Sequence, residues 1–325
     1  MTKVEKVAGI DISKDFFDVC AITKENERQR RFTNDVRGFE EFKSWISEDT
    51  LCVMEVTGPY YLRVATYLHL KGFTVSVINP LVIKRFCQMR LIRAKTDKAD
   101  AKMIALYGLS EPLQLWSVPD DCIITMQQLD AISEQLSKQR TALHNQLEAF
   151  TQSGAVKKQI RQFLVKAIRA IEKQQACIEK QTDTLIMEHY LEMMKNLTSI
   201  PGLGKKTAMV LIVLTGGFKK FTSAKQLSAY VGLAPRIYQS ASTVKGKARI
   251  CKMGMGRIRA LLYLCAWSAK RCNKACKELY ERLIAKGKAR KAALIAVANK
   301  LLKQAFAIAN NNQPYSLTYS KKIFL

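Results

Sequence analysis

Residues 7–14 read Val-Ala-Gly-Ile-Asp-Ile-Ser-Lys, and this stretch decides which fold the chain is expected to adopt. Small and apolar residues lead into Asp11, and a second apolar run over 16–22 follows almost at once. The pattern predicts a buried strand, a tight turn and a second strand. Aspartate is unfavourable in a strand, and a buried carboxylate is costly unless it is paired or binds a cation. On this hairpin alone Asp11 is either a turn residue that caps its own backbone or part of a functional site.

Residues 1 to about 110 continue as alternating strands and helices. The expected elements are a strand over 28–34, a helix over 36–47, a strand over 51–56, a helix over 60–71, a strand over 74–78 and a basic helical segment that runs to Arg93. Because a helix joins the fourth and fifth strands, they should be parallel. The order predicts an α/β domain in which the first three strands form a meander and the fourth can neighbour the first.

Three further acids lie, like Asp11, at the ends of expected strands or helices. Glu55 ends the fourth strand, and Asp97 and Asp100 lie in the first turn of a helix that begins after Thr96. Helix capping and the helix dipole are one explanation for the second pair. Alternatively, the four carboxylates gather, and they would then repel one another unless divalent cations lie between them. Oxygen ligands without His or Cys favour Mg²⁺ or Mn²⁺, and two such ions about 3.5–4 Å apart would support phosphoryl transfer.

The composition is that of a globular protein, with 325 residues, 48% apolar and 25% charged. No apolar run reaches the ~18 residues of a membrane span, and residues 1–6 lack the apolar core of a signal peptide. The nine cysteines form no CxxC pair and there are three histidines, which argues against a zinc site. We therefore expect a reduced, cytoplasmic protein.

The positive charge is concentrated in one part of the chain. The net charge is +26, and residues 191–325 carry 26 Lys and Arg against three acids, a net charge of +23. Such a region would repel itself without a polyanion, so nucleic acid is the expected partner. The alternative is a basic face for an acidic protein or a membrane, although no amphipathic membrane helix is evident.

The middle of the chain has a helical periodicity. Residues 111–121 contain two prolines and Trp116 and are expected to be a linker. From about 123 to 190 apolar residues recur at steps of three, four and seven, which predicts a coiled coil. A break near Ser153-Gly154 predicts a hairpin of two helices. We expect a role in assembly, with plain domain spacing as the alternative.

Residues 197–208 read as a helix–hairpin–helix motif. The turn Pro201-Gly202-Leu203-Gly204 separates two apolar helices, and the glycines allow a sharp turn and a close backbone approach. The amides that begin the second helix, with Lys205 and Lys206, could hold a DNA phosphate without reading sequence. A plain helix–helix turn is the alternative.

A polar, basic loop follows the short helix over 226–234. It places Ser240, Ser242 and Thr243 among cations: Arg236, Lys245, Lys247, Arg249 and Lys252. A serine hydroxyl is a weak nucleophile unless it is activated, and no histidine is near in sequence. The residues alone therefore favour a loop that grips phosphate. After Gly256 we expect one helix that runs to about Ala285 and a second over 292–308.

These N-terminal motifs resemble the DEDD-type transposases of insertion sequences. The resemblance rests on Asp11 at the end of the first strand, on Glu-Val-Thr-Gly from Glu55, and on Lys-Thr-Asp-Lys-Ala-Asp-Ala at 95–101. It implies a RuvC-like (ribonuclease H) domain in which Asp11, Glu55, Asp97 and Asp100 form a metal-binding tetrad for Mg²⁺ or Mn²⁺.

The C-terminal motifs resemble the same family, which includes Piv-like and bridge-RNA-guided recombinases. The matching positions are Pro235, Arg236, Ser240, Gly246, Arg249, Gly254 and Arg259. The resemblance implies a covalent serine nucleophile, by position Ser240, although Ala241 replaces the glycine that the family usually has there. It also implies that the two sites meet across subunits, and that a structured guide RNA pairs with donor and target DNA.

We therefore expect a RuvC-like α/β domain over 1–115, a coiled-coil helical hairpin over 122–190 and a basic, mainly helical transposase domain over 191–325. The expected protein is a cytoplasmic, nucleoid-associated transposase or site-specific recombinase, a dimer or tetramer that acts on double-stranded DNA at element ends and target, without a membrane part. The competing interpretations are a Holliday-junction nuclease that cuts with metals alone and a non-enzymatic DNA-architectural protein. The expected nucleic-acid contacts are Gly202, Gly204, Lys205, Lys206, Arg236, Lys245, Lys247, Arg249, Lys252, Arg257 and Arg259.

Overall fold

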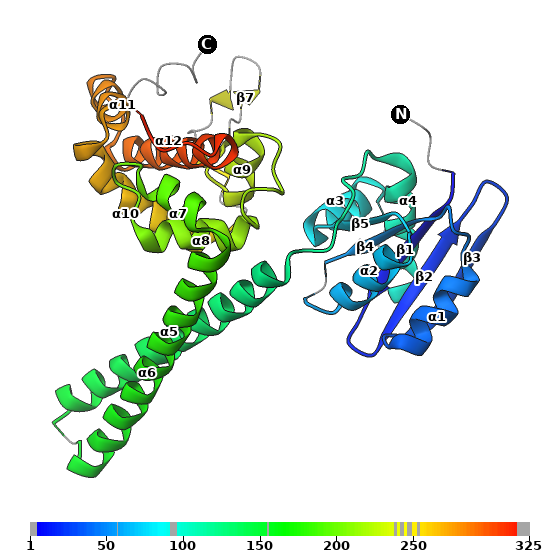
Figure 1. Ribbon diagram of the computed structural model, residues 1–325, viewed down its shortest axis with the longest axis horizontal. Helices are drawn as coiled ribbons and strands as arrows, with labels where there is room; N and C mark the ends of the chain where they lie inside the picture. The colour runs from blue at the N-terminus through cyan, green and yellow to red at the C-terminus, as the bar shows by residue number, and fades with distance from the viewer. Residues whose placement is uncertain are drawn as a thin grey trace. The chain divides into compact units, whose positions relative to one another are not determined.

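The structure is a computed structural model that describes residues 5–56, 58–91, 96–154, 156–236, 239–240, 244–245, 249–251 and 254–316. Within these ranges, the side chains of residues 97–98, 236, 239–240, 244–245 and 249 are not described. The chain divides into two compact units, Met1–Val118 and Pro119–Leu325, which are labelled by element in Figure 1.

Unit 1 contains a five-stranded mixed sheet with the order β3-β2-β1-β4-β5. Its strands are β1 (Val7–Ile12), β2 (Phe16–Ile22), β3 (Glu27–Thr33), β4 (Leu51–Glu55) and β5 (Val75–Ile78). The first three strands form the expected antiparallel meander, while β4 pairs with β1 and with β5 in parallel. The prediction that the fourth strand neighbours the first is thus confirmed, as is the parallel pairing of the fourth and fifth.

Two helices cover one face of this sheet. Helices α1 (Val36–Trp45) and α2 (Tyr61–Leu70) pack on the even-numbered residues of β1 and β4, around buried aromatic rings that include Phe17 and Phe42. Asp35 caps α1 by accepting a hydrogen bond from the Gly38 amide at 2.9 Å. The aromatic residues Phe39, Phe42 and Trp45 lie on one face of α1 and pack into this cluster.

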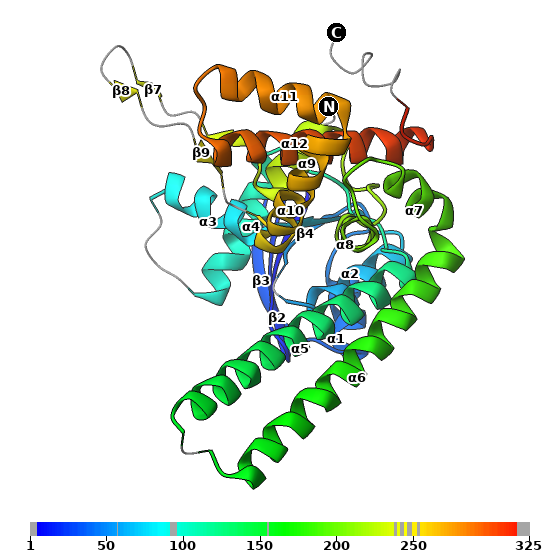
Figure 2. The same cartoon turned by 90° about the vertical axis from the view of Figure 1, so that its left-hand side faces the viewer.

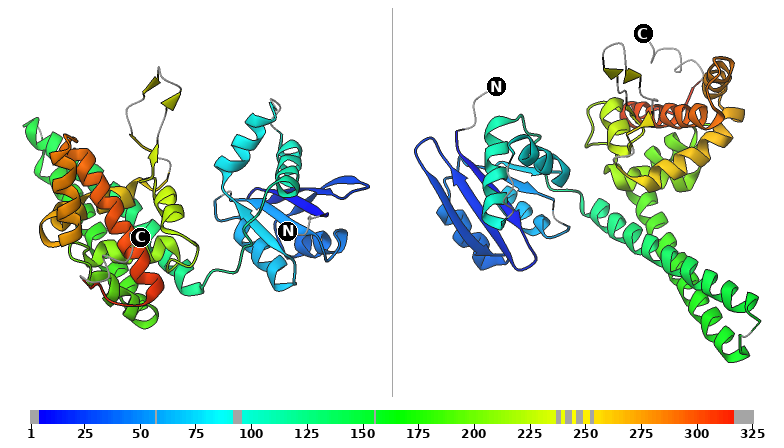
Figure 3. Two further views of the ribbon diagram at one scale, coloured as in Figure 1. Left: turned by 90° about the horizontal axis from the view of Figure 1, so that it is seen from above. Right: turned by 180° about the vertical axis from the view of Figure 1, so that it is seen from behind.

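The opposite face is covered by α3 (Pro80–Met89) and α4 (Asp97–Ser110), as Figures 2 and 3 show. Helix α4 approaches the sheet very closely at Gly9. A Cβ atom added to Gly9 would lie 2.2 Å from the backbone nitrogen of Ala105 and 2.3 Å from the carbonyl oxygen of Ala101. Gly108 of α4 is restricted less severely, since a Cβ there would lie 2.8 Å from a side-chain atom of Val7 and 2.9 Å from one of Val53. These glycines set the distance between the helix and the sheet.

Unit 2 is mainly helical. Its first two helices, α5 (Asp121–Gln152) and α6 (Lys158–His189), pack against each other as a hairpin, as the sequence predicts. The remaining helices are α7 (Leu191–Thr198), α8 (Lys205–Thr215), α9 (Ala224–Val231), α10 (Gly256–Cys272), α11 (Lys274–Ala285) and α12 (Arg290–Asn311). Two-residue strands form two small pairs, β6 (Pro235–Arg236) with β9 (Arg249–Ile250) and β7 (Gln239–Ser240) with β8 (Val244–Lys245).

The prediction of one helix from Gly256 to about Ala285 is wrong in one respect, because Asn273 divides this stretch into two helices. The Asn273 side chain is fully buried and accepts a hydrogen bond from the Cys276 amide, so it caps α11. Its amide group also donates to Gln304 of α12 at 3.1 Å. An asparagine offers the backbone an alternative to a continuous helix, and here α12 stabilises that alternative.

Among the described residues, α12 is the single helix long and apolar enough to be compared with a membrane span. Half of its most apolar window is buried within the protein, and Leu301, Leu302 and Ala305 are fully buried in the core of unit 2. Its apolar character is thus explained by packing against α9, α10 and α11.

The packing at Gly9 gives a stability prediction. Gly9→Ala should lower the free energy of unfolding of unit 1 by about 3 kcal/mol or more, because the added methyl group collides with the α4 backbone. Gly72→Ala is the matched control: no atom lies near its Cβ position, and only its positive φ is unfavourable, which costs about 1 kcal/mol. Urea unfolding of both variants checks this, and equal losses would contradict it.

Candidate active site

Two of the expected carboxylates lie at the carboxyl ends of neighbouring parallel strands. The β1–β4 register pairs Ile10 with Met54, and Asp11 and Glu55 each follow directly in their strands. Residues at matching positions in paired strands project from the same face of a sheet. Both acids are partly buried, and both belong to the face that α4 covers. The sheet topology therefore brings Asp11 and Glu55 together.

The direction of α4 brings the other two acids to the same end of the sheet. Along β1, Val7 faces Gly108 and Gly9 faces Ala101 and Ala105, so α4 runs antiparallel to the strand. The next residue of β1 on this face is Asp11, and the next turn of α4 in that direction is its first turn. Asp97 and Asp100 begin this turn, and Asp100 is partly buried. The side chain of Asp97 lies outside the described part of the chain.

The cap of α4 is made by Thr96. Its hydroxyl accepts a hydrogen bond from the Ala99 amide at 3.2 Å, as expected from the sequence. Because Thr96 supplies the cap, capping does not explain Asp97 or Asp100. The positive end of the helix dipole still stabilises negative charge in this turn.

A cysteine that the sequence analysis did not single out lies beside these acids. Cys87 of α3 is half-buried, and burial raises the pKa of its thiol. The negative charges of the Asp100 and Glu55 carboxylates raise that pKa further. Among the side chains that the structure describes, which do not include that of Asp97, no group of three or more His, Cys, Asp or Glu residues forms a metal-binding cluster.

The turn before α8 is sharp and closely packed. Gly202 has φ 94°, and its Cα lies so close to α10 that an added Cβ would be 2.6 Å from Ala269. Gly204 is the N-cap residue of α8, and space around it is open. Lys205 and Lys206 are exposed in the first turn. A small, sharply turned backbone therefore presents two cations and the amides of a helix N-terminus.

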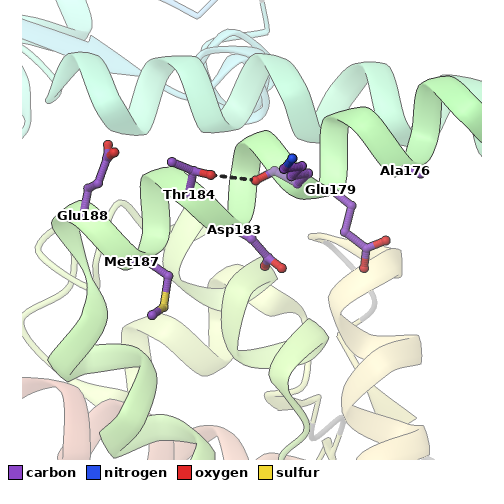
Figure 4. A pocket seen from close by; sticks show the side chains of 7 residues that line it. Ala176, Glu179, Asp183, Thr184, Met187 and Glu188 are labelled. Atoms are coloured by element: carbon purple, nitrogen blue, oxygen red, sulfur yellow. Dashed lines mark hydrogen bonds between the residues drawn. The ribbon is translucent and has the colours of Figure 1, made fainter.

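Lys205 also contacts α6. Its Nζ lies 2.7 Å from Oδ2 of Asp183, in a surface pair that contributes little to stability. Asp183 lines a surface hollow of about 610 Å³ whose lining residues all belong to α6 (Figure 4). Since the hollow also contains Glu179 and Glu188, its lining is unsuited to nucleic acid.

Arg257 and Arg259 have partners within the protein. Arg257 Nη1 lies 2.5 Å from Oδ2 of Asp130, a partly buried pair that joins α10 to α5. Arg259 Nη1 donates to the carbonyl oxygen of Val231 at 2.9 Å, at the last turn of α9. Both arginines therefore link helices of unit 2 in addition to their expected role toward nucleic acid.

The remaining expected residues lie around the small strands of unit 2. Ser240 is the second residue of β7, Lys245 the second of β8, and Arg236 and Arg249 pair between β6 and β9. Their side chains are not described, and Lys247 and Lys252 lie outside the described residues. The backbone thus places Ser240 in a hairpin whose neighbouring strand ends in a lysine.

Carboxylates at the ends of adjacent strands, beneath a helix N-terminus and in a chain with a strongly basic region, are typical of enzymes that cut and transfer nucleic-acid strands. The comparisons with known proteins agree. A transposase family model matches residues 8–153, and the model of the IS116/IS110/IS902 transposase family matches residues 194–281. The chain belongs to this family of transposases.

Relatives of nearly the same length support this assignment. The pilin gene-inverting protein of Moraxella lacunata is 33% identical over 321 residues, which cover 94% of this chain and 96% of the relative. That of Moraxella bovis is 32% identical over 319 residues, with the same coverage of 94% and 96%. The transposase for insertion sequence element IS1111A of Coxiella burnetii is 24% identical over 339 residues, covering 95% and 91%. The family consists of transposases and DNA invertases, so the chain is an enzyme of DNA recombination.

The position of Cys87 gives a direct test of the site geometry. In metal-free protein, Asp100→Asn should increase the alkylation rate of Cys87 by iodoacetamide about two- to threefold near pH 8. The rate should increase because removing a nearby negative charge lowers the thiol pKa and so increases the thiolate fraction. Peptide mass spectrometry measures the rate at this cysteine. Glu111→Gln, which changes a carboxylate beyond the other end of α4, is the control and should have no effect.

Proposed function

We propose that this transposase cuts and rejoins DNA with a divalent-metal site made by Asp11, Glu55, Asp97 and Asp100. The proposal is carried by one observation: the first turn of α4 lies at the sheet end where β1 and β4 present their two acids. In this arrangement unit 1 corresponds to a RuvC-like, ribonuclease H-type domain. Its expected extent is 1–115, followed by the helical hairpin over 122–190 and the transposase domain over 191–325.

The donor set fits Mg²⁺ or Mn²⁺. Carboxylate oxygens are the hard ligands that these ions prefer, and Asp11, Glu55 and Asp100 are partly buried rather than fully solvated. When bound, such ions supply a polarised water or hydroxyl nucleophile and stabilise a leaving oxygen. The chain itself fixes Asp11 and Glu55 by strand register and holds Asp97 and Asp100 on a capped helix. The α4 dipole favours their negative charge.

We further propose Ser240 as the covalent nucleophile of the transposase domain. Its place in the β7–β8 hairpin, the cations around it in sequence and its position in the family pattern support this assignment. The Ser240 hydroxyl would attack a DNA phosphorus atom, form a phosphoester and release a DNA hydroxyl, and rejoining would reverse this exchange. Arg236, Lys245, Lys247, Arg249 and Lys252 would bind the phosphate and stabilise its charge.

The partners are double-stranded DNA at element ends and target, and a guide RNA encoded by the element. The +23 charge of residues 191–325 is compatible with both. The helix–hairpin–helix turn would bind the DNA backbone through Gly202, Gly204, Lys205 and Lys206. We propose that the α5–α6 hairpin contributes to a dimer or tetramer in which the two active sites act together. The names of the Moraxella relatives extend this proposal to DNA inversion.

A Holliday-junction-type nuclease is the alternative enzyme, because the same carboxylates could cut DNA without a serine. A DNA-architectural protein would need only the basic surface. The two experiments that follow distinguish these functions.

The first experiment removes the proposed metal ligand on β1. Asp11→Asn should abolish Mg²⁺-dependent strand cleavage, by about a thousandfold or more, while DNA binding changes less than about twofold. Asp15→Asn is the matched control, since Asp15 is an exposed acid of the neighbouring turn. Gel assays of cleavage and binding, with circular dichroism to confirm folding, measure both. Cleavage that survives in Asp11→Asn would remove the tetrad from the mechanism.

The second experiment tests the nucleophile. Wild-type protein, labelled element-end DNA, Mg²⁺ and RNA from the flanks of the element should give a labelled protein band on a denaturing gel. The band should disappear in Ser240→Ala and persist in Ser242→Ala, the matched control two residues away. The opposite pattern would assign the nucleophile to Ser242. Cleaved DNA without a covalent band would favour the metal-only nuclease.

A further inference from the structure

An exposed aromatic ring lies on α10, on the side of the helix that faces away from the core of unit 2. Leu262, Ala266 and Ala269 of this helix are fully buried in that core. Trp267, by contrast, is 46% exposed, and Leu264, on the preceding turn, is 65% exposed. Packing within unit 2 therefore does not explain why α10 presents a tryptophan and a leucine together at its surface.

A cation is held against the Trp267 ring. The Lys270 Nζ atom lies 4.1 Å from the centroid of this ring and 4.9 Å from the centroid of the Tyr280 ring, which belongs to α11. A cation in contact with two rings is attracted by both, so these contacts hold the ammonium group and restrict the indole. The result is an aromatic surface with a positive charge fixed beside it, while nearly half of Trp267 faces solvent.

The charges near this ring are mainly positive. Helix α10 contains four cations and no acid, and its Arg271, four residues after Trp267, is exposed. Helix α11 contains three cations and two acids, Glu278 and Glu281. Glu281 lies 3.9 Å from Lys277 in an ion pair, so part of this negative charge is already balanced.

An exposed aromatic ring among cations suits a single nucleic-acid strand. An unpaired base stacks on the ring, while the phosphates beside that base bind the cations. Duplex DNA keeps its bases stacked on one another, so it would be bound there through its phosphates alone. A second copy of this surface is a poor partner, because it would bring cations of the same sign together.

We propose that Trp267 is a stacking site for an unpaired DNA base, and that Lys270 and Arg271 bind the adjoining phosphates. DNA is the partner because the chain is an enzyme of DNA recombination, and strands that are cut and exchanged expose unpaired bases. The inference goes beyond the proposed function and requires neither the metal site nor Ser240.

The test is the binding of a dye-labelled oligodeoxyuridine to full-length protein at near-physiological salt, measured by fluorescence anisotropy. Trp267→Ala should weaken binding roughly tenfold, because the stacked base loses its partner. Leu264→Ala is the matched control: it removes a more exposed apolar side chain from the same side of α10 but no ring, and its affinity should stay within about twofold of wild type. A blunt DNA duplex should bind wild type and Trp267→Ala equally.

Tryptophan emission gives a second readout, which a merely structural role would not change. The oligonucleotide should quench the emission of wild type, and Trp267→Phe should lose this quenching, since Trp45 and Trp116 pack in unit 1. Trp267→Phe keeps a ring and should retain affinity to within about threefold. Arg271→Gln should reduce the slope of log affinity against log salt by about 0.7, as expected for one lost phosphate contact.

Three outcomes would overturn the proposal. Equal weakening by Trp267→Ala and Leu264→Ala, or quenching that persists in Trp267→Phe, would exclude stacking on this ring. Tighter binding of an oligouridine, which differs from the probe only in its 2′-hydroxyls, would make RNA the occupant in place of DNA. Concentration-dependent sedimentation that Trp267→Ala abolishes would assign the surface to a second copy. Melting temperatures establish that each variant is folded, and Trp267→Phe keeps the test decisive if Trp267→Ala unfolds.

Discussion

The close contact between α4 and β1 is the constraint on which the candidate active site depends. With no side chain at Gly9, the backbone of α4 lies directly on the strand, and Gly108 of α4 packs closely on Val7, two residues earlier in β1. The contact fixes both the distance of the helix from the sheet and the direction in which it runs. Because α4 runs antiparallel to β1, its first turn comes to the strand end that carries Asp11. A larger residue at position 9 would separate the two pairs of acids.

The two parts of the chain differ in net charge. In unit 1, Asp11, Glu55 and Asp100 are partly buried, and the buried Asp18 is paired with Arg31. The strongly basic region begins after residue 190, where polyanion binding requires no fixed geometry. The proposed mechanism uses both signs of charge, acids to hold metal ions and bases to bind DNA phosphates.

Much of the fold could be predicted from the sequence because local patterns determine it. The β1–β2 hairpin, the parallel β4–β5 connection and the cap at Thr96 each depend on a few adjacent residues. The division of the helix at Asn273 could not be predicted, since it depends on a hydrogen bond to Gln304 from a distant helix.

The candidate site, like the fold, could be predicted only where local sequence patterns determine it. Asp11 and Glu55 could be placed together because the β1–β2–β3 meander leaves one edge of β1 open for pairing with β4. Cys87 and the Asp18–Arg31 pair were missed because register and helix packing, which no short motif encodes, bring them to the acids. For the same reason the partners of Arg257 and Arg259, on α5 and α9, could not be found from a basic stretch alone.

The most direct measurement of the central claim is anomalous scattering from crystals of the protein soaked in Mn²⁺. The account predicts anomalous peaks between the ends of β1 and β4 and the first turn of α4, within coordination distance of Asp11 and Glu55, together with Asp97 or Asp100. Ordered acids with no peak among them, or a peak bound elsewhere in unit 1, would contradict it.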